Sequence, residues 1–388
     1  MQDANRADRI SEYMLSLFRS KLCAMTNGPP QPTISLSRPS CVSKTLTREI
    51  RSVVDGLVHA VLNPVHMSWD AEEYMAAQGK ISSHKRGAGL DEQLFASFPP
   101  WASEIVKVQS CRTAVDCNGR ILAWMLPRIL PRRLQDQLTH ATIIIKEALH
   151  QNRVNQARKS ESWRASKYLF KPVNGIAGLI NMSPAWFMQG WAGNPDGLRT
   201  SHILQTALGQ DWMEMTWQAG ALMSGMLHIM HPEQYSMAHA LQTRLREISR
   251  LRVPVSQWNS VFTAMSLIAN RTCPFHLDEE GHAHWYDLLC SVGDYKEATM
   301  ELKTLGFQIP NPPGTIVAFS GTLIPHSVDS ADGSRFSHIF YMRKNLPPFF
   351  NLRLAGWMTQ DYYTGLMGSQ QAKDLKRLHR PRDAFVKY

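Results

Sequence analysis

Two histidines and one aspartate constrain this chain more strongly than any other feature of its sequence. His276 and Asp278 lie two residues apart in Cys273-Pro-Phe-His-Leu-Asp, a segment of strand character, and His326 follows in Ile324-Pro-His-Ser. Residues two apart on a strand point to the same face of a sheet. Two imidazoles and one carboxylate can occupy three corners of an octahedron around Fe(II), and the open corners accept a chelating co-substrate and O2. The pattern predicts an iron centre with His276, Asp278 and His326 as ligands.

Beyond Asp278 the chain has the pattern of short strands separated by turns. Runs of strand character recur at residues 284–290, 298–302, 315–319 and 336–341. Such an array is typical of a double-stranded β-helix, or jelly roll. Arg335 comes after the last histidine, where a cation would bind a carboxylate of the co-substrate. This order favours an α+β oxygenase that uses Fe(II) and 2-oxoglutarate; the alternative is a structural His-x-Asp pair in an unrelated β-sandwich.

The composition agrees with a large protein of a reducing compartment. The chain has 388 residues, 44% of them hydrophobic, which is enough for one large domain or a core with an extension. Its 6 cysteines form no Cys-x-x-Cys pair, which argues against a zinc ribbon and a disulfide framework. We expect no membrane span and no secretory signal. The net charge of +10 is compatible with a polyanionic partner and equally with an ordinary basic protein.

The segments before residue 253 read as mostly helical. Amphipathic or helical patterns are expected at residues 4–25, 46–62, 132–157, 200–228 and 232–250. Residues 64–100 look loop-rich, and Asn118-Gly119 between apolar runs predicts a β-hairpin at 106–126. We therefore expect a helical and loop-rich extension at 1–252 that packs on the core, with the hairpin added to one sheet. The catalytic core is expected at 253–346 and a basic C-terminal tail at 347–388.

The last strand-like run carries a family resemblance. Arg335-Phe-Ser-His-Ile-Phe-Tyr-Met-Arg343 resembles the final core strand of the TET/JBP family of nucleic-acid base oxygenases, most closely its transposon-associated fungal members. The resemblance is sharpest over 270–346. It implies that Arg335 and Ser337 bind the distal carboxylate of 2-oxoglutarate, that Arg271 also faces this co-substrate, and that Tyr341 stacks on a flipped base.

Two positions depart from the pattern of family members that act on 5-methylcytosine. Gly281 stands where Asp or Asn is common, and Arg343 stands where His is common. Gly281 could enlarge the base pocket, and Arg343 could donate to an oxygen or nitrogen of the base. Asp287, on the next expected strand, could accept a hydrogen bond from an exocyclic amino group; the alternative is a surface salt bridge. A roomier pocket with this carboxylate would also admit N6-methyladenine.

The resemblance implies oxidation of 5-methylcytosine to 5-hydroxymethylcytosine and beyond in double-stranded DNA, with O2 consumed and the base flipped out of the helix. Demethylation of N6-methyladenine is a possible second reaction. Four basic residues are candidates for contact with the DNA backbone, namely Lys85, Arg86, Arg164 and Lys167. They lie in basic clusters, one of which adjoins Trp163. The alternative is that these clusters are ordinary solvent-exposed faces. A DNA substrate implies nuclear residence, and no obligate protein partner is evident.

Three other functions stay open at this point. An AlkB-like repair demethylase shares the iron ligands, but its second arginine usually lies six residues after the first, where this chain has Tyr341. A hydroxylase of proteins or small molecules has the same fold. A DNA-binding protein that has lost its activity is the third, and the intact set of His276, Asp278 and His326 argues against it.

Overall fold

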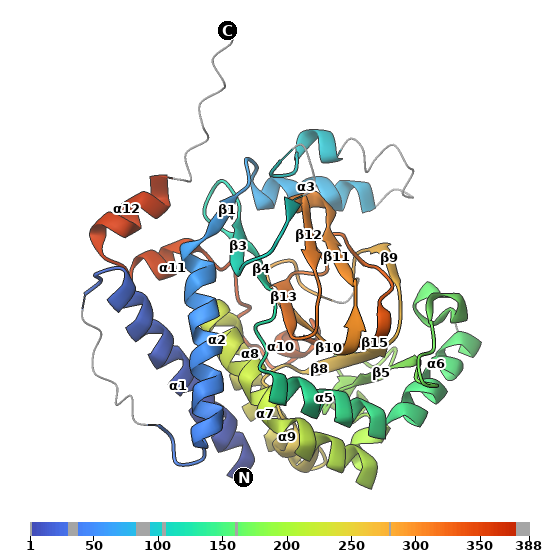
Figure 1. Cartoon of the computed structure of the whole chain (residues 1–388). Helices are drawn as coiled ribbons and strands as arrows, with labels where there is room; N and C mark the ends of the chain where they lie inside the picture. The colour runs from blue at the N-terminus through green and yellow to red at the C-terminus, as the bar shows by residue number, and fades with distance from the viewer. Residues whose placement is uncertain are drawn as a thin grey trace.

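Two facing β-sheets form the centre of the fold, and helices cover the outer face of the larger sheet (Figure 1). The structure, a computed structural model, describes residues 2–29, 38–82, 94–102, 106–159, 162–278 and 281–377. The larger sheet has eight strands, in the order β1 (Pro64–His66), β3 (Arg112–Val115), β4 (Ile121–Leu126), β13 (Thr315–Phe319), β10 (Asp287–Lys296), β15 (Asp332–Tyr341), β8 (Ala264–Ala269) and β5 (Gly178–Met182). The smaller sheet has five, in the order β2 (Val106–Lys107), β12 (Phe307–Pro310), β11 (Thr299–Leu302), β14 (His326–Val328) and β9 (Cys273–His276). The predicted α+β fold with a jelly-roll core is confirmed.

The remaining elements surround these sheets. The α-helices are α1 (Gln2–Met25), α2 (Lys44–Leu62), α3 (Ala71–Ser82), α5 (Arg132–Ile144), α6 (Lys146–Lys159), α7 (Ala207–Met230), α8 (Pro232–Glu247), α9 (Arg252–Gln257), α10 (Leu346–Phe349), α11 (Gln360–Thr364) and α12 (Ser369–Arg377). Short 3-10 turns are η1 (Trp163–Ala165), η2 (Lys167–Leu169), η3 (Pro195–Gly197), η4 (His202–Gln205) and η5 (Lys303–Leu305), and β6 (Trp186–Phe187) pairs with β7 (Leu198–Arg199). Within the described ranges, no helix combines the length and the apolar character that a membrane crossing needs.

Side chains of β10 and β15 alternate between the two faces of the larger sheet. On β10, Leu288 and Cys290 are buried against the helices, whereas Leu289 and Ser291 face the space between the sheets. The antiparallel register pairs Ser291 with Ser337 on β15, so these two residues point to the same side. The cavity-facing residues of β15 are Arg335, Ser337, Ile339 and Tyr341.

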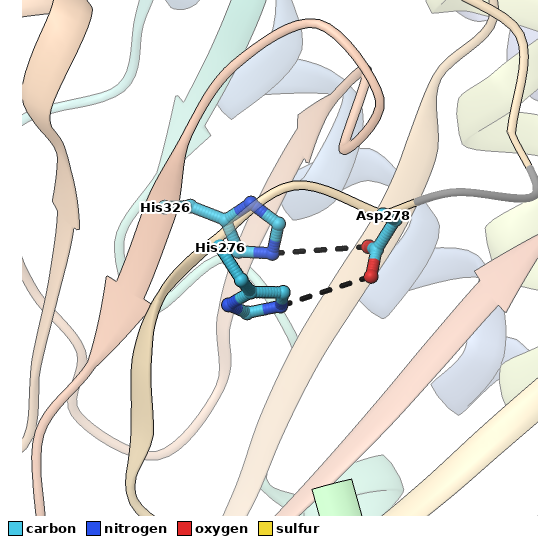
Figure 2. Close-up of side chains that lie close together, drawn as sticks. All are labelled: His276, Asp278 and His326. Carbon is cyan, nitrogen blue, oxygen red and sulfur yellow. Dashed lines mark ion pairs between the residues drawn. The ribbon is translucent and has the colours of Figure 1, made fainter. Parts of the chain in front are cut away.

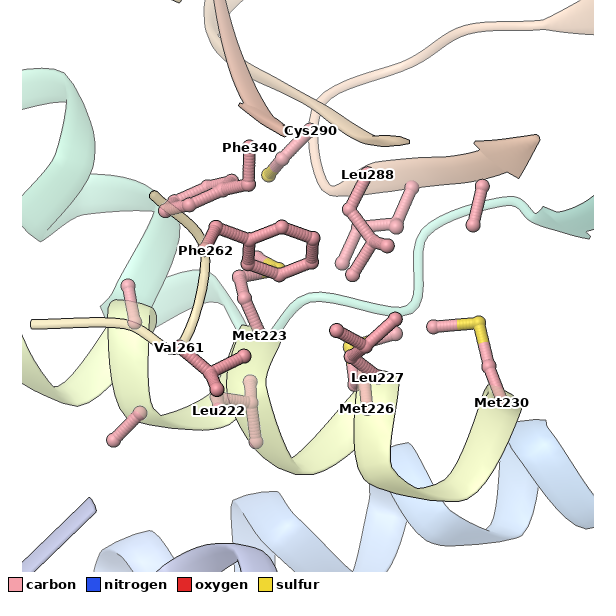
Figure 3. Packing of buried hydrophobic residues seen from close by; sticks show 14 of the residues in the cluster. Leu222, Met223, Met226, Leu227, Met230, Val261, Phe262, Leu288, Cys290 and Phe340 are labelled. Carbon is pink, nitrogen blue, oxygen red and sulfur yellow. The ribbon is translucent and has the colours of Figure 1, made fainter. Parts of the chain in front are cut away.

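The helix side of the larger sheet packs on α7. Figure 3 shows methionines and leucines of α7 beneath Phe262, Leu288, Cys290 and Phe340. The rings of Phe262 and Phe340 lie 5.9 Å apart. Flexible methionine side chains fill the irregular space between a helix and a twisted sheet. Four methionines of this helix are buried, Met213, Met223, Met226 and Met230, and Met215 is partly buried against the same core.

Strands from both sides of residue 252, the expected start of the core, pair in the larger sheet. β3 and β4 form the predicted hairpin around Asn118-Gly119, and β4 pairs with β13. β5, which was not predicted, also precedes this boundary and pairs with β8 along its whole length. Gly178, the first residue of β5, lies so close to α6 that an added Cβ would come within 2.4 Å of the Leu149 carbonyl oxygen. The segment before residue 253 is therefore part of the same sheet as the core.

Two further segments contain structure that the sequence patterns did not indicate. Residues 64–100, expected to be loop-rich, include β1 and α3. The segment expected as a basic C-terminal tail packs on the rest of the fold in its described part, because Tyr363 on α11 is fully buried and donates a hydrogen bond of 2.7 Å to the Ile229 carbonyl oxygen. Trp285 Nε1 likewise donates to the Ala355 carbonyl oxygen at 3.2 Å. Both contacts join positions that are distant in the sequence, which local patterns do not reveal.

The packing of α7 on the sheet gives the first prediction. We expect Phe262→Ala to lower the free energy of unfolding by about 3–5 kcal/mol, because the truncation leaves a cavity between α7 and the sheet. Denaturant unfolding followed by circular dichroism measures the change. Val253→Ala, at a position that is 61% exposed, serves as the control and should change this free energy by less than about 0.5 kcal/mol. Equal effects of the two substitutions would contradict the packing described.

Candidate iron centre and its cavity

Strand pairing brings the three predicted metal ligands together. β14 pairs with β9 so that His326 lies opposite His276. The Nε2 atom of His276 is 3.7 Å from Asp278 Oδ1, and that of His326 is 3.8 Å from Asp278 Oδ2 (Figure 2). One ligand atom from each residue can be chosen so that all lie within 4.8 Å of one another. The geometry is that of a three-ligand site for one ion.

Asp278 is placed differently from the prediction. β9 ends at His276, so the two ligands do not share one strand. Asp278 lies just beyond the strand, where its backbone N–H donates to the Gly321 carbonyl oxygen at 2.9 Å. A Cβ at Gly321 would come within 2.6 Å of Asp278 Oδ2. The absence of a side chain at residue 321 therefore leaves room for the ligand carboxylate.

The donor set fits a ferrous ion. Nδ1 of His276 lies 2.8 Å from the Pro274 carbonyl oxygen, and Nδ1 of His326 lies 3.1 Å from that of Ile324. A carbonyl oxygen only accepts, so Nδ1 carries the proton in each ring and Nε2 offers its lone pair toward Asp278. Burial, and next the neighbouring His326, lowers the pKa of His276 to about 4. Burial also lowers the pKa of His326, so both rings are in the neutral form that binds a metal.

A cavity of about 340 Å³ extends from this site between the sheets. The residues of the larger sheet that line it are Leu179, Asn181, Ser266, Ile268, Asp287, Leu289, Ser291, Val317, Arg335, Ser337, Ile339 and Tyr341. Those of the smaller sheet are Cys273, His276, Met300, His326 and Val328. The metal ligands and the cavity-facing residues of β15 thus share one continuous space.

Arg335 is a buried cation that lacks a carboxylate hydrogen-bond partner among the described residues. Its side chain donates to Ser337 Oγ at 2.9 Å and to the carbonyl oxygens of Arg271 and Asp329. Its Nε is buried without a partner in the part of the chain that the structure describes, and burial lowers its pKa. A buried guanidinium is costly without an anion. The distal carboxylate of 2-oxoglutarate would supply that anion, with Ser337 beside it.

Arg271 also lines the cavity, but much of its guanidinium is already engaged. Its Nη1 donates to the Arg164 carbonyl oxygen at 2.9 Å, and its Nε contacts Cys273 Sγ at 3.3 Å. The guanidinium carbon lies 5.3 Å from the centre of the Trp163 ring. A direct contact of Arg271 with the co-substrate stays a prediction.

The residues predicted to face the base lie toward the other end of the cavity. Tyr341, Asp287 and Gly281 are all in its wall. Arg343 follows β15 and lies outside this lining set, with its guanidinium carbon 5.9 Å from the centre of the Tyr341 ring. Asp287 is the first residue of β10, and burial, with Asp278 as the next cause, raises its pKa well above the usual value. The alternative of an exposed salt bridge for Asp287 is excluded by this burial.

Sequence reasoning missed several polar groups of the cavity, and three of them come from α6, β5 and β8. They are Gln156 on α6, Asn181 on β5 and Ser266 on β8. Ser266 Oγ donates to Asn181 Oδ1 at 2.6 Å, which leaves the amide nitrogen of Asn181 available as a donor. The only signal was a single Asn within the apolar run Gly178-Leu-Ile-Asn-Met, and that run was not predicted as a strand.

The residues predicted to contact DNA lie in different places in the structure. Lys85 and Arg86 lie outside the described residues. Lys167 is exposed, and its Nζ lies 5.2 Å from the ring centre of Tyr168, which is 86% exposed. Arg164 instead lines the cavity, where its Nη2 is 3.3 Å from Asp278 Oδ1. Contact of Arg164 with the DNA backbone stays a prediction, and in the structure an ion pair with Asp278 holds its guanidinium toward the candidate metal site.

The cavity predicts a specific effect of Arg335→Lys on co-substrate binding. We expect the Kd of 2-oxoglutarate to rise at least about tenfold, because a lysine cannot hold a carboxylate bidentately. The Kd of 2-oxopentanoate, which lacks the distal carboxylate, should change little. Calorimetry with Mn(II) in place of Fe(II) measures both constants.

The matched control for this experiment is Arg246→Lys, which changes a half-buried arginine on α8 away from the cavity. It should leave both constants unchanged. An equal loss for the two acids in Arg335→Lys would mean that Arg335 shapes the cavity and does not bind the distal carboxylate.

One family model matches the part of the chain that contains this site. Residues 190–344 match the Tet_JBP family, described as the oxygenase domain of the 2OGFeDO superfamily. No curated protein matches the chain. Among solved structures, NgTET1 in complex with 5mC DNA has a TM-score of 0.43 and 14% sequence identity, covering 63% of this chain and 81% of that chain.

The family match also bears on the predicted limits and kinship of the core. It begins at residue 190, well before the predicted limit of 253, and it includes all three candidate metal ligands. The predicted closeness to fungal members stays a prediction. Residues 190–344 thus match the oxygenase domain of the TET/JBP family, and the protein is an Fe(II)- and 2-oxoglutarate-dependent oxygenase.

Proposed function

We propose that this protein oxidises the methyl group of modified bases in double-stranded DNA. The observation that carries the proposal is the layout of one face of β15, where Arg335 and Tyr341 both line the same cavity. Six residues of strand separate their Cα atoms by roughly 20 Å. This length accommodates a small dicarboxylate at one end and a planar ring at the other, with the metal ligands in the opposite wall.

Different residues would bind the metal ion and the co-substrate in such a reaction. With Fe(II) and 2-oxoglutarate bound, the site supplies an oxidation in which O2 hydroxylates a C–H bond while 2-oxoglutarate becomes succinate and CO2. His276, Asp278 and His326 would hold the ion through the atoms that face one another. Arg335 and Ser337 would bind the distal carboxylate, which fixes the orientation of the co-substrate.

The base would reach the site by leaving the DNA helix. A methyl group inside a duplex cannot enter the cavity, so the nucleotide must flip at a cost of a few kcal/mol. Stacking on Tyr341 would offset part of this cost. The exposed pair Lys167 and Tyr168 and the net charge of +10 support contact with a polyanion. A DNA substrate also implies nuclear residence, which is part of the proposal.

Asp287 is the group that we propose for recognition of an exocyclic amine. A Cβ at Gly281 would point to within 3.9 Å of Asp287 Oδ2. A carboxylate or amide side chain at residue 281 would therefore compete for the space of the Asp287 carboxyl group. Asp287, at the start of β10, can make the hydrogen bond to the base that such a side chain would make. A carboxyl group keeps an acceptor oxygen in either protonation state. The amino groups of cytosine and adenine are both suitable donors.

The substrate range also depends on the glycine at position 281. A Cβ there would lie 2.4 Å from Thr322 Oγ1 and 3.9 Å from Asp287 Oδ2, so the Thr322 hydroxyl, and no side chain of residue 281, borders the cavity beside Asp287. Hydroxylation of the 5-methylcytosine methyl group gives a stable alcohol that can be oxidised again. Hydroxylation of the N6-methyladenine methyl group gives a hemiaminal, which breaks its N–C bond to release formaldehyde and the unmodified base. We propose both reactions, with 5-methylcytosine as the first.

Turnover on defined duplexes tests the proposed function. We expect oxidised methylcytosine from a 5-methylcytosine duplex, and loss of N6-methyl from the adenine counterpart, in air with Fe(II) and 2-oxoglutarate. Mass spectrometry of the nucleosides measures both products, and His276→Ala provides the blank. Succinate formed without any change in the bases would point to a protein or small-molecule hydroxylase. Reaction only with other N-alkylated bases would favour an AlkB-like activity.

The space at residue 281 gives a separate prediction about substrate range. Gly281→Val should lower kcat/KM for N6-methyladenine at least about tenfold more than for 5-methylcytosine, because the added side chain and the Thr322 hydroxyl, which lies 2.4 Å from the position of a Cβ at residue 281, would then compete for the room beside Asp287. Gly79→Ala on α3, where an added Cβ meets nothing within 4 Å, is the control and should leave both values unchanged. Equal losses for both substrates would contradict a purine-specific use of this space.

A further inference from the structure

We propose that Arg164 is a positioning residue for the iron site, and that Trp163 holds it in place. Both residues belong to the 3-10 turn η1, which lies before the segment that matches the family model. The proposal concerns how the metal ligands are ordered. It depends on the iron assignment and not on which base is oxidised.

Arg164 contacts the aspartate ligand directly. Its Nη2 donates to Asp278 Oδ1 at 3.3 Å and to the Leu277 carbonyl oxygen at 3.2 Å. Asp278 Oδ2 lies on the side of His326, 3.8 Å from its Nε2. A carboxylate has lone pairs for several partners, so Asp278 can bind a metal while it accepts from Arg164. The guanidinium thus restricts both the side chain of Asp278 and the backbone beside it.

Trp163 connects this contact to a second ligand. Its ring lies edge-to-face with that of His276, with 4.8 Å between centres and an interplanar angle of 65°. The Arg164 guanidinium carbon is 4.9 Å from the centre of the Trp163 ring, and that of Arg271 is 5.3 Å away. Arg271 also donates to the Arg164 carbonyl oxygen. Two adjacent residues of one turn therefore touch two of the three ligands.

Asp278 is the ligand that most needs such support. It lies beyond the end of β9, so ladder hydrogen bonds do not hold it, and its side chain is 41% exposed, compared with 11% for His276 and 5% for His326. An exposed side chain loses rotamer freedom when it binds an ion. A partner that orders the carboxylate beforehand reduces this loss. The positive charge of Arg164 opposes that of a dication, and we expect the ordering of the Asp278 carboxylate to outweigh this repulsion.

Binding of Mn(II) alone to the full chain tests the inference. We expect Arg164→Ala to raise the Kd of Mn(II) by 10–100-fold, the usual effect of removing a partner of a metal ligand, and Arg164→Lys to recover part of the loss. Electron paramagnetic resonance of free Mn(II) gives the Kd. The unfolding midpoint without metal should stay unchanged in Arg164→Ala, while the rise of this midpoint on adding Mn(II) should shrink. A merely structural role would lower the midpoint without metal.

Arg158→Ala is the matched control, because Arg158 is exposed at the end of α6 and should bind Mn(II) like the unchanged chain. Mn(II) binding by Arg164→Ala that equals or exceeds that of the unchanged chain would overturn the inference. Should Arg164→Ala not fold, Arg164→Gln and Arg164→Lys decide the matter, and unchanged affinity in both would overturn it. Unchanged Mn(II) binding by His276→Ala would instead overturn the metal site itself.

Discussion

The alternation of side chains along β15 is the constraint on which the rest of the structure depends. Phe336 and Phe340 point into the helix core, and Arg335, Ser337 and Tyr341 point into the cavity. His338, on the helix side, lies 3.3 Å from the Thr142 hydroxyl on α5. A slip of one residue would exchange the two sets. Such a slip would bury Arg335 against α7 and would point Phe336 and Phe340 into the cavity. The packing of the helices on one face of β15 therefore determines which side chains line the cavity on the other face.

The smaller sheet adds the metal ligands to this frame. Pairing of β9 with β14 places two histidines opposite each other, and neutral backbone carbonyls orient both rings. The third ligand is held less rigidly, by one backbone hydrogen bond to Gly321 and by Arg164. The two histidines are therefore already oriented to bind a metal ion. The aspartate completes it, and the contacts of its carboxylate determine how firmly an ion is held.

Segments before the matched family domain contribute to the same cavity. β5 provides Asn181, and η1 provides Arg164. These elements stay in place because β5 pairs with β8 and because Gly178 lets α6 approach the sheet closely. The segment that matches the family model thus supplies the three metal ligands and Arg335. The segment before it supplies further side chains of the cavity wall that a substrate would contact.

The sequence by itself determined the metal ligands, the jelly-roll class and the arginine on the last strand, because these depend on residue type, on strand-like runs and on order along the chain. It did not determine the strand at 178–182 or the position of Asp278 beyond its strand. It also did not indicate the contact of Arg164 with Asp278 across 114 residues of sequence. Only the tertiary structure decided these points. The spacing of apolar residues and the composition of a segment indicate which face of a helix or strand is buried. Which element packs on that face depends on contacts among segments that are far apart in the chain.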